Sequence, residues 1–107
     1  MPLVTVTMIK GKSKDYRKAI LDIVHASLVA AFKIPDHDMN QRIIEIDPDS
    51  CEFPKGKSES FMTIEMTVFP GRSIEVKRTL YQGIVNGLKT LGIASDDILI
   101  VLKEPQL

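Results

Sequence analysis

The sequence predicts a small α/β fold of the α+β type, built as a tandem β-α-β repeat. Segments rich in β-branched residues alternate with two long stretches of helical periodicity. The two halves of the chain, about residues 1–50 and 58–107, repeat the same motifs. A length of 107 residues suits one domain with its own core. We therefore expect a single domain over residues 1–107.

The first half predicts a strand, a helix and a second strand. Residues 3–9 are rich in Val and Thr and predict a strand. A basic glycine turn follows, and Ser13 is a suitable N-cap for a helix over residues 14–32, where apolar side chains recur at helical spacing. Pro35 ends this helix, and residues 43–46 predict the second strand.

The second half repeats this order after a long connection. Residues 47–60 are dense in Pro, Gly, Ser and Asp and predict an irregular segment between the halves. A strand, a helix N-capped by Ser73 and a last strand then follow over residues 61–69, 74–91 and 98–102. Gly92 is expected at the C′ position that closes the second helix.

The two halves can be aligned on their turn motifs. Gly11-Lys12-Ser13 matches Gly71-Arg72-Ser73, and the apolar stripes of the two helices coincide around these points. Because a β-α-β unit makes a right-handed crossover, each half predicts a parallel strand pair. The result is a four-stranded, mainly parallel-paired sheet with both helices on one face.

The second face of this sheet predicts self-association. Residues 98–102 are apolar on both sides of their strand, yet no third helix is available to cover the second side. A large uncovered apolar face is not expected on a soluble monomer. We therefore expect a homo-oligomer whose sheets cover each other.

Composition excludes several classes of partner. The 14 basic and 14 acidic residues cancel, which argues against a protein that binds nucleic acid or an anionic membrane surface. No run of about 18 apolar residues and no signal peptide are evident, so we expect a cytoplasmic protein. The single Cys51 suits a reducing compartment and has no companions of metal-ligand spacing.

Pro2 is a candidate catalytic base. If Met1 is removed, as is usual before a small second residue, Pro2 becomes a free secondary amine at the start of a strand. An α-amino group has a pKa of about 7.7–8.0. Modest desolvation or a neighbouring cation therefore leaves much of it unprotonated at neutral pH. The alternative is that Met-Pro is an accident, because proline is tolerated at the first residue of a strand.

The Met-Pro start, the repeat and the stretch Thr67-Val68-Phe69-Pro70-Gly71-Arg72-Ser73 together resemble the tautomerase superfamily over essentially the whole chain. This superfamily includes 4-oxalocrotonate tautomerase, macrophage migration inhibitory factor (MIF) and malonate semialdehyde decarboxylase. The resemblance implies a homotrimer of β-α-β-β-α-β subunits. It also implies that Pro2, in a pocket near a subunit interface, moves a proton between oxygen and carbon of a small-molecule enol or 2-oxo acid. That reaction needs no cofactor.

Three further residues are candidates for this site. Arg72 lies between a strand and a helix, where a guanidinium suits a substrate carboxylate and lowers the pKa of a nearby amine, and it matches the family's arginine at this turn. Asp38 reproduces the Pro-x-x-Asp spacing of the decarboxylase branch, although it also suits an ordinary turn residue. His25 lies where dehalogenase-like members place a histidine that helps to hold the substrate; otherwise it is a structural residue.

One departure from the family bears on the substrate. Decarboxylase and dehalogenase members carry two arginines at the second-helix turn, and here the partner position is Pro70. A site with one arginine suits a monocarboxylate, so we expect keto-enol tautomerisation of a small or aromatic 2-oxo acid, with Arg72 holding the carboxylate and Asp38 as a candidate auxiliary acid or base. The alternatives are a malonate semialdehyde decarboxylase-like decarboxylase or hydratase, which Asp38 favours and Pro70 disfavours, and a non-catalytic MIF-like binding module.

Overall fold

The computed structural model of the chain describes residues 2–106. Within this range it contains four strands and two α-helices. The strands are β1 (Leu3–Ile9), β2 (Gln41–Ile46), β3 (Met62–Thr67) and β4 (Ile98–Lys103), and the helices are α1 (Lys14–Phe32) and α2 (Ile74–Lys89). Two short 3-10 turns, η1 (Pro48–Ser50) and η2 (Ser95–Asp97), precede β3 and β4.

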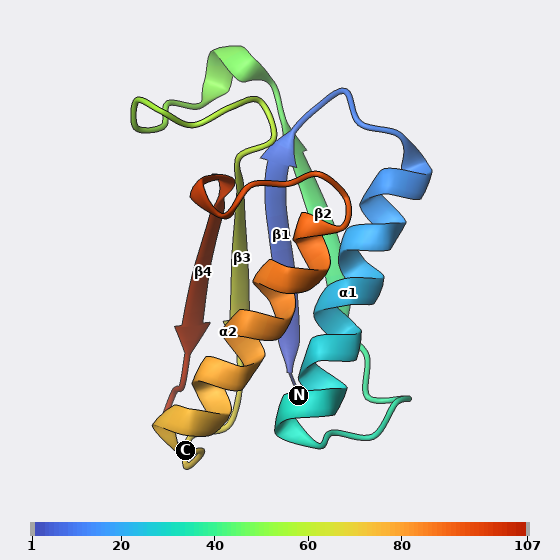
Figure 1. The fold of residues 1–107 in the computed structure, drawn as a ribbon, viewed down its shortest axis with the longest axis vertical. Helices are drawn as coiled ribbons and strands as arrows, with labels where there is room; N and C mark the ends of the chain where they lie inside the picture. Colours follow the sequence, from blue (N-terminus) through green and yellow to red (C-terminus); the bar gives the residue numbers. More distant parts are fainter. Residues whose placement is uncertain (1, 107) are drawn as a thin grey trace.

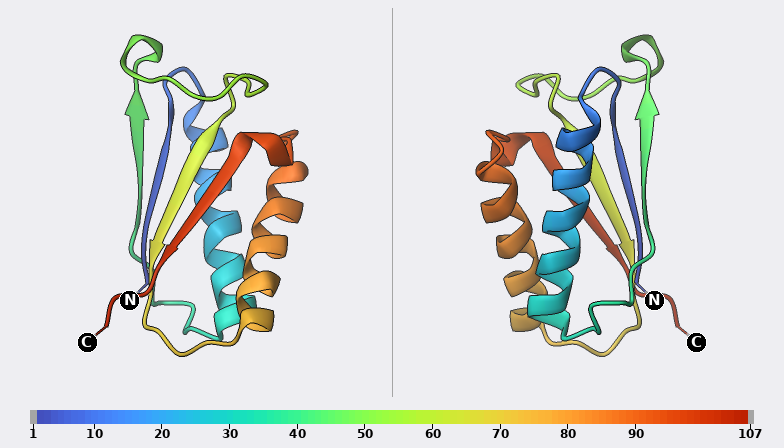
Figure 2. Two further views of the ribbon diagram at one scale, coloured as in Figure 1. Left: turned by 90° about the vertical axis from the view of Figure 1, so that its left-hand side faces the viewer. Right: turned by 90° about the vertical axis from the view of Figure 1, so that its right-hand side faces the viewer.

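The strands form one sheet in the order β2-β1-β3-β4. The pairs β1–β2 and β3–β4 are parallel, and β1 and β3 are antiparallel at the centre. Both helices cover the same face of the sheet, as the edge-on views show (Figure 1, Figure 2). The predicted tandem repeat and its two-layer arrangement are confirmed.

Alternation along the strands builds the core between the two layers. The side chains that face the helices from β1 and β3 are buried: Val4, Val6, Met8, Met62, Ile64 and Met66. The apolar stripes of the helices meet them, through Ile20, Val24, Leu28, Leu80, Ile84 and Leu88. The residues between these positions on each strand therefore form the opposite face of the sheet.

The helix ends follow the local sequence signals. Ser13 and Ser73 are both N-caps, and each side chain accepts a hydrogen bond from the backbone N–H three residues later. At the end of α2, Gly92 has a φ of 81°, and its N–H donates to the Lys89 carbonyl. The next N–H, of Ile93, donates to the Leu88 carbonyl, which completes a Schellman motif with Gly92 at C′.

The bounds of several elements differ slightly from the predictions. Helix α2 ends at Lys89 rather than residue 91, because its final turn tightens into the glycine cap. Strand β2 begins at Gln41, two residues early, because its pairing with β1 starts there. Strand β3 stops at Thr67, and Phe69 leaves the sheet with 45% of its surface exposed.

The second face of the sheet carries no helix (Figure 2). Its central positions are polar, with Thr5 and Thr7 on β1 beside Thr63 and Glu65 on β3. Apolar side chains lie toward the two edges, where Ile44 is 45% and Leu99 49% exposed. The exposed apolar surface is therefore confined to the edges of this face, and the large continuous apolar face that the sequence predicted is not found among residues 2–106. Among residues 2–106, no helix is both long and apolar enough to cross a bilayer.

Candidate active site

The antiparallel pairing of β1 and β3 brings Pro2 and Arg72 to one end of the sheet. Leu3 faces Thr67 in the ladder, so the start of β1 adjoins the end of β3. Pro2 precedes this pair and is buried, and Arg72 lies in the turn from β3 into α2. Figure 1 shows the amino terminus at the same end of the molecule as that turn. Residues 70 positions apart in sequence are therefore neighbours by topology.

Arg72 is held by two contacts of the surrounding chain. Its Nη1 donates a hydrogen bond to the Phe69 carbonyl oxygen at 3.1 Å. The guanidinium carbon lies 4.1 Å from the ring centroid of Phe32, at the end of α1, which is a cation–π contact. Across residues 2–106 no carboxylate forms an ion pair with Arg72. The guanidinium is therefore held in place, and no carboxylate of residues 2–106 neutralises its charge.

The segment between α1 and β2 carries Asp38 to this end. The Asp38 N–H donates to the Pro35 carbonyl at 3.0 Å, which closes a turn. Asn40, two residues further on, accepts a hydrogen bond from the Val4 N–H at 2.9 Å. Asp38 itself is half-buried. The loop is thereby fastened to the start of β1, within two residues of Pro2.

His25 contacts this loop from inside helix α1. It is only 7% exposed, and its Nε2 lies 2.8 Å from the Asp36 carbonyl oxygen and 3.3 Å from Asp36 Oδ1. Because a carbonyl oxygen can only accept, Nε2 carries the proton in this contact. The structure therefore places His25 against the loop that carries Asp38. A direct contact of His25 with substrate stays a prediction.

The Pro2 end is bordered by exposed apolar side chains. Four of the exposed large hydrophobic residues belong to segments that meet there: Leu3, Met39, Phe69 and Ile74. Three cavities within residues 2–106 lie elsewhere, and neither Pro2 nor Arg72 lines them. This end of the sheet thus combines Pro2, the expected base, with the Arg72 cation and exposed apolar side chains.

Two partners in this arrangement were not identified from the sequence. Phe32 belongs to the apolar stripe of α1, and nothing in that pattern distinguishes it as the ring beneath Arg72. Asp36 precedes the expected Asp38 by two residues and is the one that contacts His25. Both contacts join segments that are distant in the chain, so no local sequence signal marks them.

Comparisons with known proteins show the family. Residues 38–106 match the Tautomerase_2 family model and residues 2–58 the Tautomerase model, both described as tautomerase enzymes. The chain belongs to the tautomerase family. Two probable tautomerases of Bacillus subtilis (strain 168) are similar along nearly the whole chain. YrdN is 27% identical, over 97% of this chain and 84% of its own length. YusQ is 23% identical, over 95% of this chain and 85% of its own.

Solved structures with the same fold include two malonate semialdehyde decarboxylases. The FG41 enzyme, inhibited by 3-bromopropiolate, has a TM-score of 0.89 and 30% identity over 96% of this chain and 82% of its own. A second decarboxylase, described with decarboxylase and hydratase activities, has a TM-score of 0.90 and 25% identity, over 97% of this chain and 84% of its own. A fused 4-OT symmetric trimer shares the fold at a TM-score of 0.83 and 18% identity, over 96% of this chain and 85% of its own.

Proposed function

We propose that the protein is a cofactor-independent keto-enol tautomerase that acts on a small or aromatic 2-oxo acid. The observation that carries this proposal is the β1–β3 register, which brings the start of β1 beside the turn that holds Arg72. Membership of the tautomerase family supports the same reaction class. In this proposal Pro2 is the general base and acid, and Arg72 binds the substrate carboxylate.

The proposed reaction is a proton transfer within the enol. The Pro2 nitrogen removes the proton from the enol hydroxyl, the oxygen electrons form the carbonyl, and the protonated amine returns a proton to the adjacent carbon. The base must be largely unprotonated at neutral pH for the first step. In this proposal, the burial of Pro2 and the positive charge of Arg72 disfavour the protonated amine and so favour the free base.

A free Pro2 amine requires removal of Met1. Met1 lies outside the described residues, so its removal remains part of the proposal. The retained methionine would convert the Pro2 nitrogen into a tertiary amide without basicity, and the enzyme would then be inactive. An intact mass measurement therefore has to accompany every assay.

We further propose that the active unit is a homotrimer. The open face of the sheet has apolar edges, and apolar side chains border the Pro2 end without enclosing it. A neighbouring subunit that packs on the open face would supply the missing wall. Fold neighbours that are fused 4-OT trimers are consistent with this assembly.

The experiment that tests the tautomerase is the ketonisation of phenylenolpyruvate, followed by absorbance with protein whose mass confirms loss of Met1. We expect measurable activity, and we expect Pro2→Ala to lose at least about 100-fold in kcat, the scale of general acid–base catalysis. Pro54→Ala, at an exposed loop proline, is the matched control and should keep full activity. A processed oligomer with no rate above buffer would exclude this substrate, and an active Pro2→Ala variant would exclude Pro2 as the base.

A second candidate is a malonate semialdehyde decarboxylase-like activity. Two decarboxylases are among the solved structures with this fold, at 30% and 25% identity. Asp38 lies in a loop fastened to the start of β1, where an ionised carboxylate could assist proton transfer or activate water.

Asp38→Asn tests the decarboxylase candidate. If decarboxylation is the activity, this variant should release carbon dioxide from malonate semialdehyde at least about tenfold more slowly than wild type. Asp49→Asn, at an exposed aspartate in η1, is the control and should match wild type. Wild-type protein that ketonises phenylenolpyruvate and leaves malonate semialdehyde intact would remove the decarboxylase candidate.

A further inference from the structure

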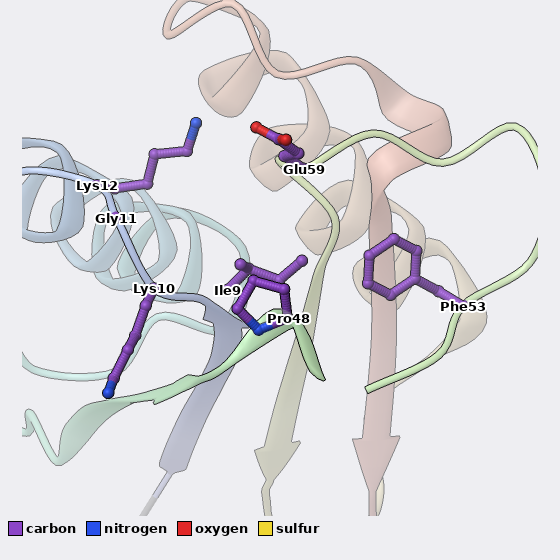
Figure 3. Close-up of a pocket in the computed structure, with 7 residues that line it drawn as sticks. All are labelled: Ile9, Lys10, Gly11, Lys12, Pro48, Phe53 and Glu59. Atoms are coloured by element: carbon purple, nitrogen blue, oxygen red, sulfur yellow. The ribbon is translucent and has the colours of Figure 1, made fainter. Parts of the chain in front are cut away.

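One cavity lies at the end of β1 that is opposite to Pro2. Its volume is about 320 Å³, within the lower part of the range for small-molecule sites, roughly 300–1,000 Å³. Figure 3 shows the residues that line it: Ile9, Lys10, Gly11, Lys12, Pro48, Phe53 and Glu59. We call it the Lys12–Glu59 cavity. It is formed by the end of β1 and the long connection between the halves.

The internal repeat relates this cavity to the Pro2 end. The alignment of the halves pairs Lys12 with Arg72, and the same offset pairs Thr5 with Glu65. Thr5 and Glu65 also face each other in the antiparallel β1–β3 ladder, so an approximate twofold axis passes between them. This axis exchanges the two ends of the sheet. The Lys12–Glu59 cavity is therefore the repeat counterpart of the Pro2–Arg72 site.

The turn that carries the cation is preserved between the two ends. Gly11 and Gly71 both have a positive φ, 121° and 114°, a region that favours glycine. Ser13 and Ser73 have nearly identical N-cap angles, with φ and ψ of −69° and 161° against −70° and 162°. Lys12 therefore leaves the backbone from the same local geometry as Arg72.

The catalytic base is not preserved. The repeat counterpart of Pro2 is Met62, which lies within the chain and whose nitrogen is a peptide nitrogen of β3. Its side chain is fully buried in the core. A cavity that retains the cation and has no amine can bind a ligand and has no general base of the Pro2 type.

The connecting segment that carries Glu59 forms one wall of the cavity and is held by contacts before and after this residue. The Phe53 ring lies 5.2 Å from the Phe61 ring, measured between centroids, with a tilt of 31°. The backbone N–H and the hydroxyl of Ser58 donate to the two oxygens of the buried Asp97 at 2.7 and 2.6 Å. These contacts hold the connecting segment against β3 and η2, so the cavity is a built feature of the fold.

Two opposite charges share the rim of the cavity. Figure 3 shows the Lys12 ammonium and the Glu59 carboxylate on the same side, above the apolar floor of Ile9 and Pro48. Within residues 2–106 neither of them has an ion-pair partner. Lys10 turns the other way and pairs with Asp47 at 3.5 Å, so it adds no second positive charge to this rim.

We propose that the Lys12–Glu59 cavity binds a small zwitterion with an apolar body, namely a free α-amino acid with an aromatic or large aliphatic side chain. Lys12 pairs with the carboxylate, Glu59 pairs with the ammonium group, and the side chain packs against Ile9, Pro48 and Phe53. A ligand with only a carboxylate is repelled by the negative Glu59, and a ligand with only an amine is repelled by the positive Lys12. The cavity therefore differs in ligand class from the Pro2 end, where no carboxylate of residues 2–106 pairs with Arg72.

The test compares three ligands of the same size on the processed, full-length protein. L-Phenylalanine, 3-phenylpropionate and phenethylamine are titrated by calorimetry, and the binding position is mapped from ¹⁵N amide shifts. We expect saturable binding of phenylalanine that shifts the Gly11, Lys12 and Glu59 amides, and at least about tenfold weaker binding of the other two. Lys12→Met and Glu59→Gln should each weaken phenylalanine binding by about tenfold or more, the size of one lost charge-assisted hydrogen bond.

Matched controls separate this cavity from the Pro2 end. Lys14→Met and Glu75→Gln, at exposed positions that do not line the cavity, should leave the affinity unchanged. Arg72→Ala should also leave it unchanged. The proposal is overturned if phenylalanine shifts none of the three amides, if 3-phenylpropionate binds as tightly as phenylalanine, or if Glu59→Gln keeps full affinity. The shift map is made on wild type, so it decides even if a variant fails to fold.

Discussion

Arg72 and Lys12 occupy the same position of the two halves and differ in the cation that they present. Arg72 stacks on Phe32 and donates to the Phe69 carbonyl, which leaves a planar, delocalised cation in a fixed orientation. Lys12 presents a compact ammonium on a flexible stem, with its Nζ 5.5 Å from the Tyr16 ring. The fixed, planar guanidinium of Arg72 suits a planar carboxylate. The flexible ammonium of Lys12 suits a ligand that also pairs with Glu59.

Asp97 is the residue whose charge state most clearly affects stability. The hydrogen bonds from the Ser58 hydroxyl and N–H hold the pKa of Asp97 below its usual value of 3.8, against the opposing effect of burial. Because the folded pKa lies below the unfolded one, this stabilisation is complete above the unfolded pKa and is lost as the pH falls through the folded value.

Replacement of Asp97 by Asn should therefore destabilise the fold in a pH-dependent way. At pH 7 we expect Asp97→Asn to lower the free energy of unfolding by about 1–3 kcal/mol, measured by urea denaturation at fixed protein concentration. The difference from wild type should shrink below about pH 4, since wild type then loses the same charge. Asp96→Asn, at the exposed neighbouring position, is the control. A difference that is constant with pH would contradict this account.

At the scale of the elements, the close packing of α1 on α2 depends on a small residue. A Cβ placed on Gly87 would lie 2.5 Å from Ile23 Cγ2, whereas a Cβ on Gly83 would lie 3.3 Å from Ser27 Oγ. Ile23 is β-branched and has essentially one rotamer in a helix, so it cannot easily move aside. An added Cβ is therefore tolerated at Gly83 and clashes with Ile23 at Gly87.

Gly87→Ala should destabilise the protein and Gly83→Ala should not. Alanine gains about 1 kcal/mol of helix propensity over glycine at either position. At Gly87 overpacking against Ile23 costs typically 1–3 kcal/mol, and we expect a net loss on the order of 1 kcal/mol. Thermal unfolding of both variants measures the difference. Equal melting temperatures for the two alanine variants would show that α1 and α2 adjust without cost.

At the scale of the whole molecule, the proposed assembly predicts that the open sheet face is a subunit interface. Leu99 is 49% exposed on this face, and a neighbouring subunit would bury it. A buried, unpaired carboxylate is costly, so Leu99→Glu should shift the oligomer toward monomer. Light scattering after gel filtration measures the mass.

Ala26→Glu, on the exposed side of α1, is the control for the assembly and should keep the wild-type mass. We also expect the Leu99→Glu monomer to lose ketonisation activity, because in the proposed trimer a neighbouring subunit encloses the Pro2 end. A Leu99→Glu variant that stays a trimer would show that the open face is not the interface. A fully active monomer would show that the site is complete within one chain.

Much of the fold could be predicted from the sequence because its signals are local. Helical periodicity, the serine N-caps, the glycine at C′ and the repeated turn each lie within a few residues of the structure they specify. The repeat then predicted parallel pairs and a single helical layer through the handedness of the crossover. For the candidate site, the sequence supplied Pro2, Arg72, Asp38 and His25 as residue types at family positions, and their catalytic roles stay predictions.

The contacts that position these residues were decided only by the tertiary structure. The stack of Arg72 on Phe32 joins the turn before α2 to the end of α1, the bond from His25 to Asp36 joins a helix to a later loop, and the anchor of Ser58 on Asp97 joins two connections. None of these pairs follows from periodicity, because each depends on how distant segments pack. The sequence by itself determined the elements and their repeat, and packing decided which ends meet and therefore where a ligand can bind.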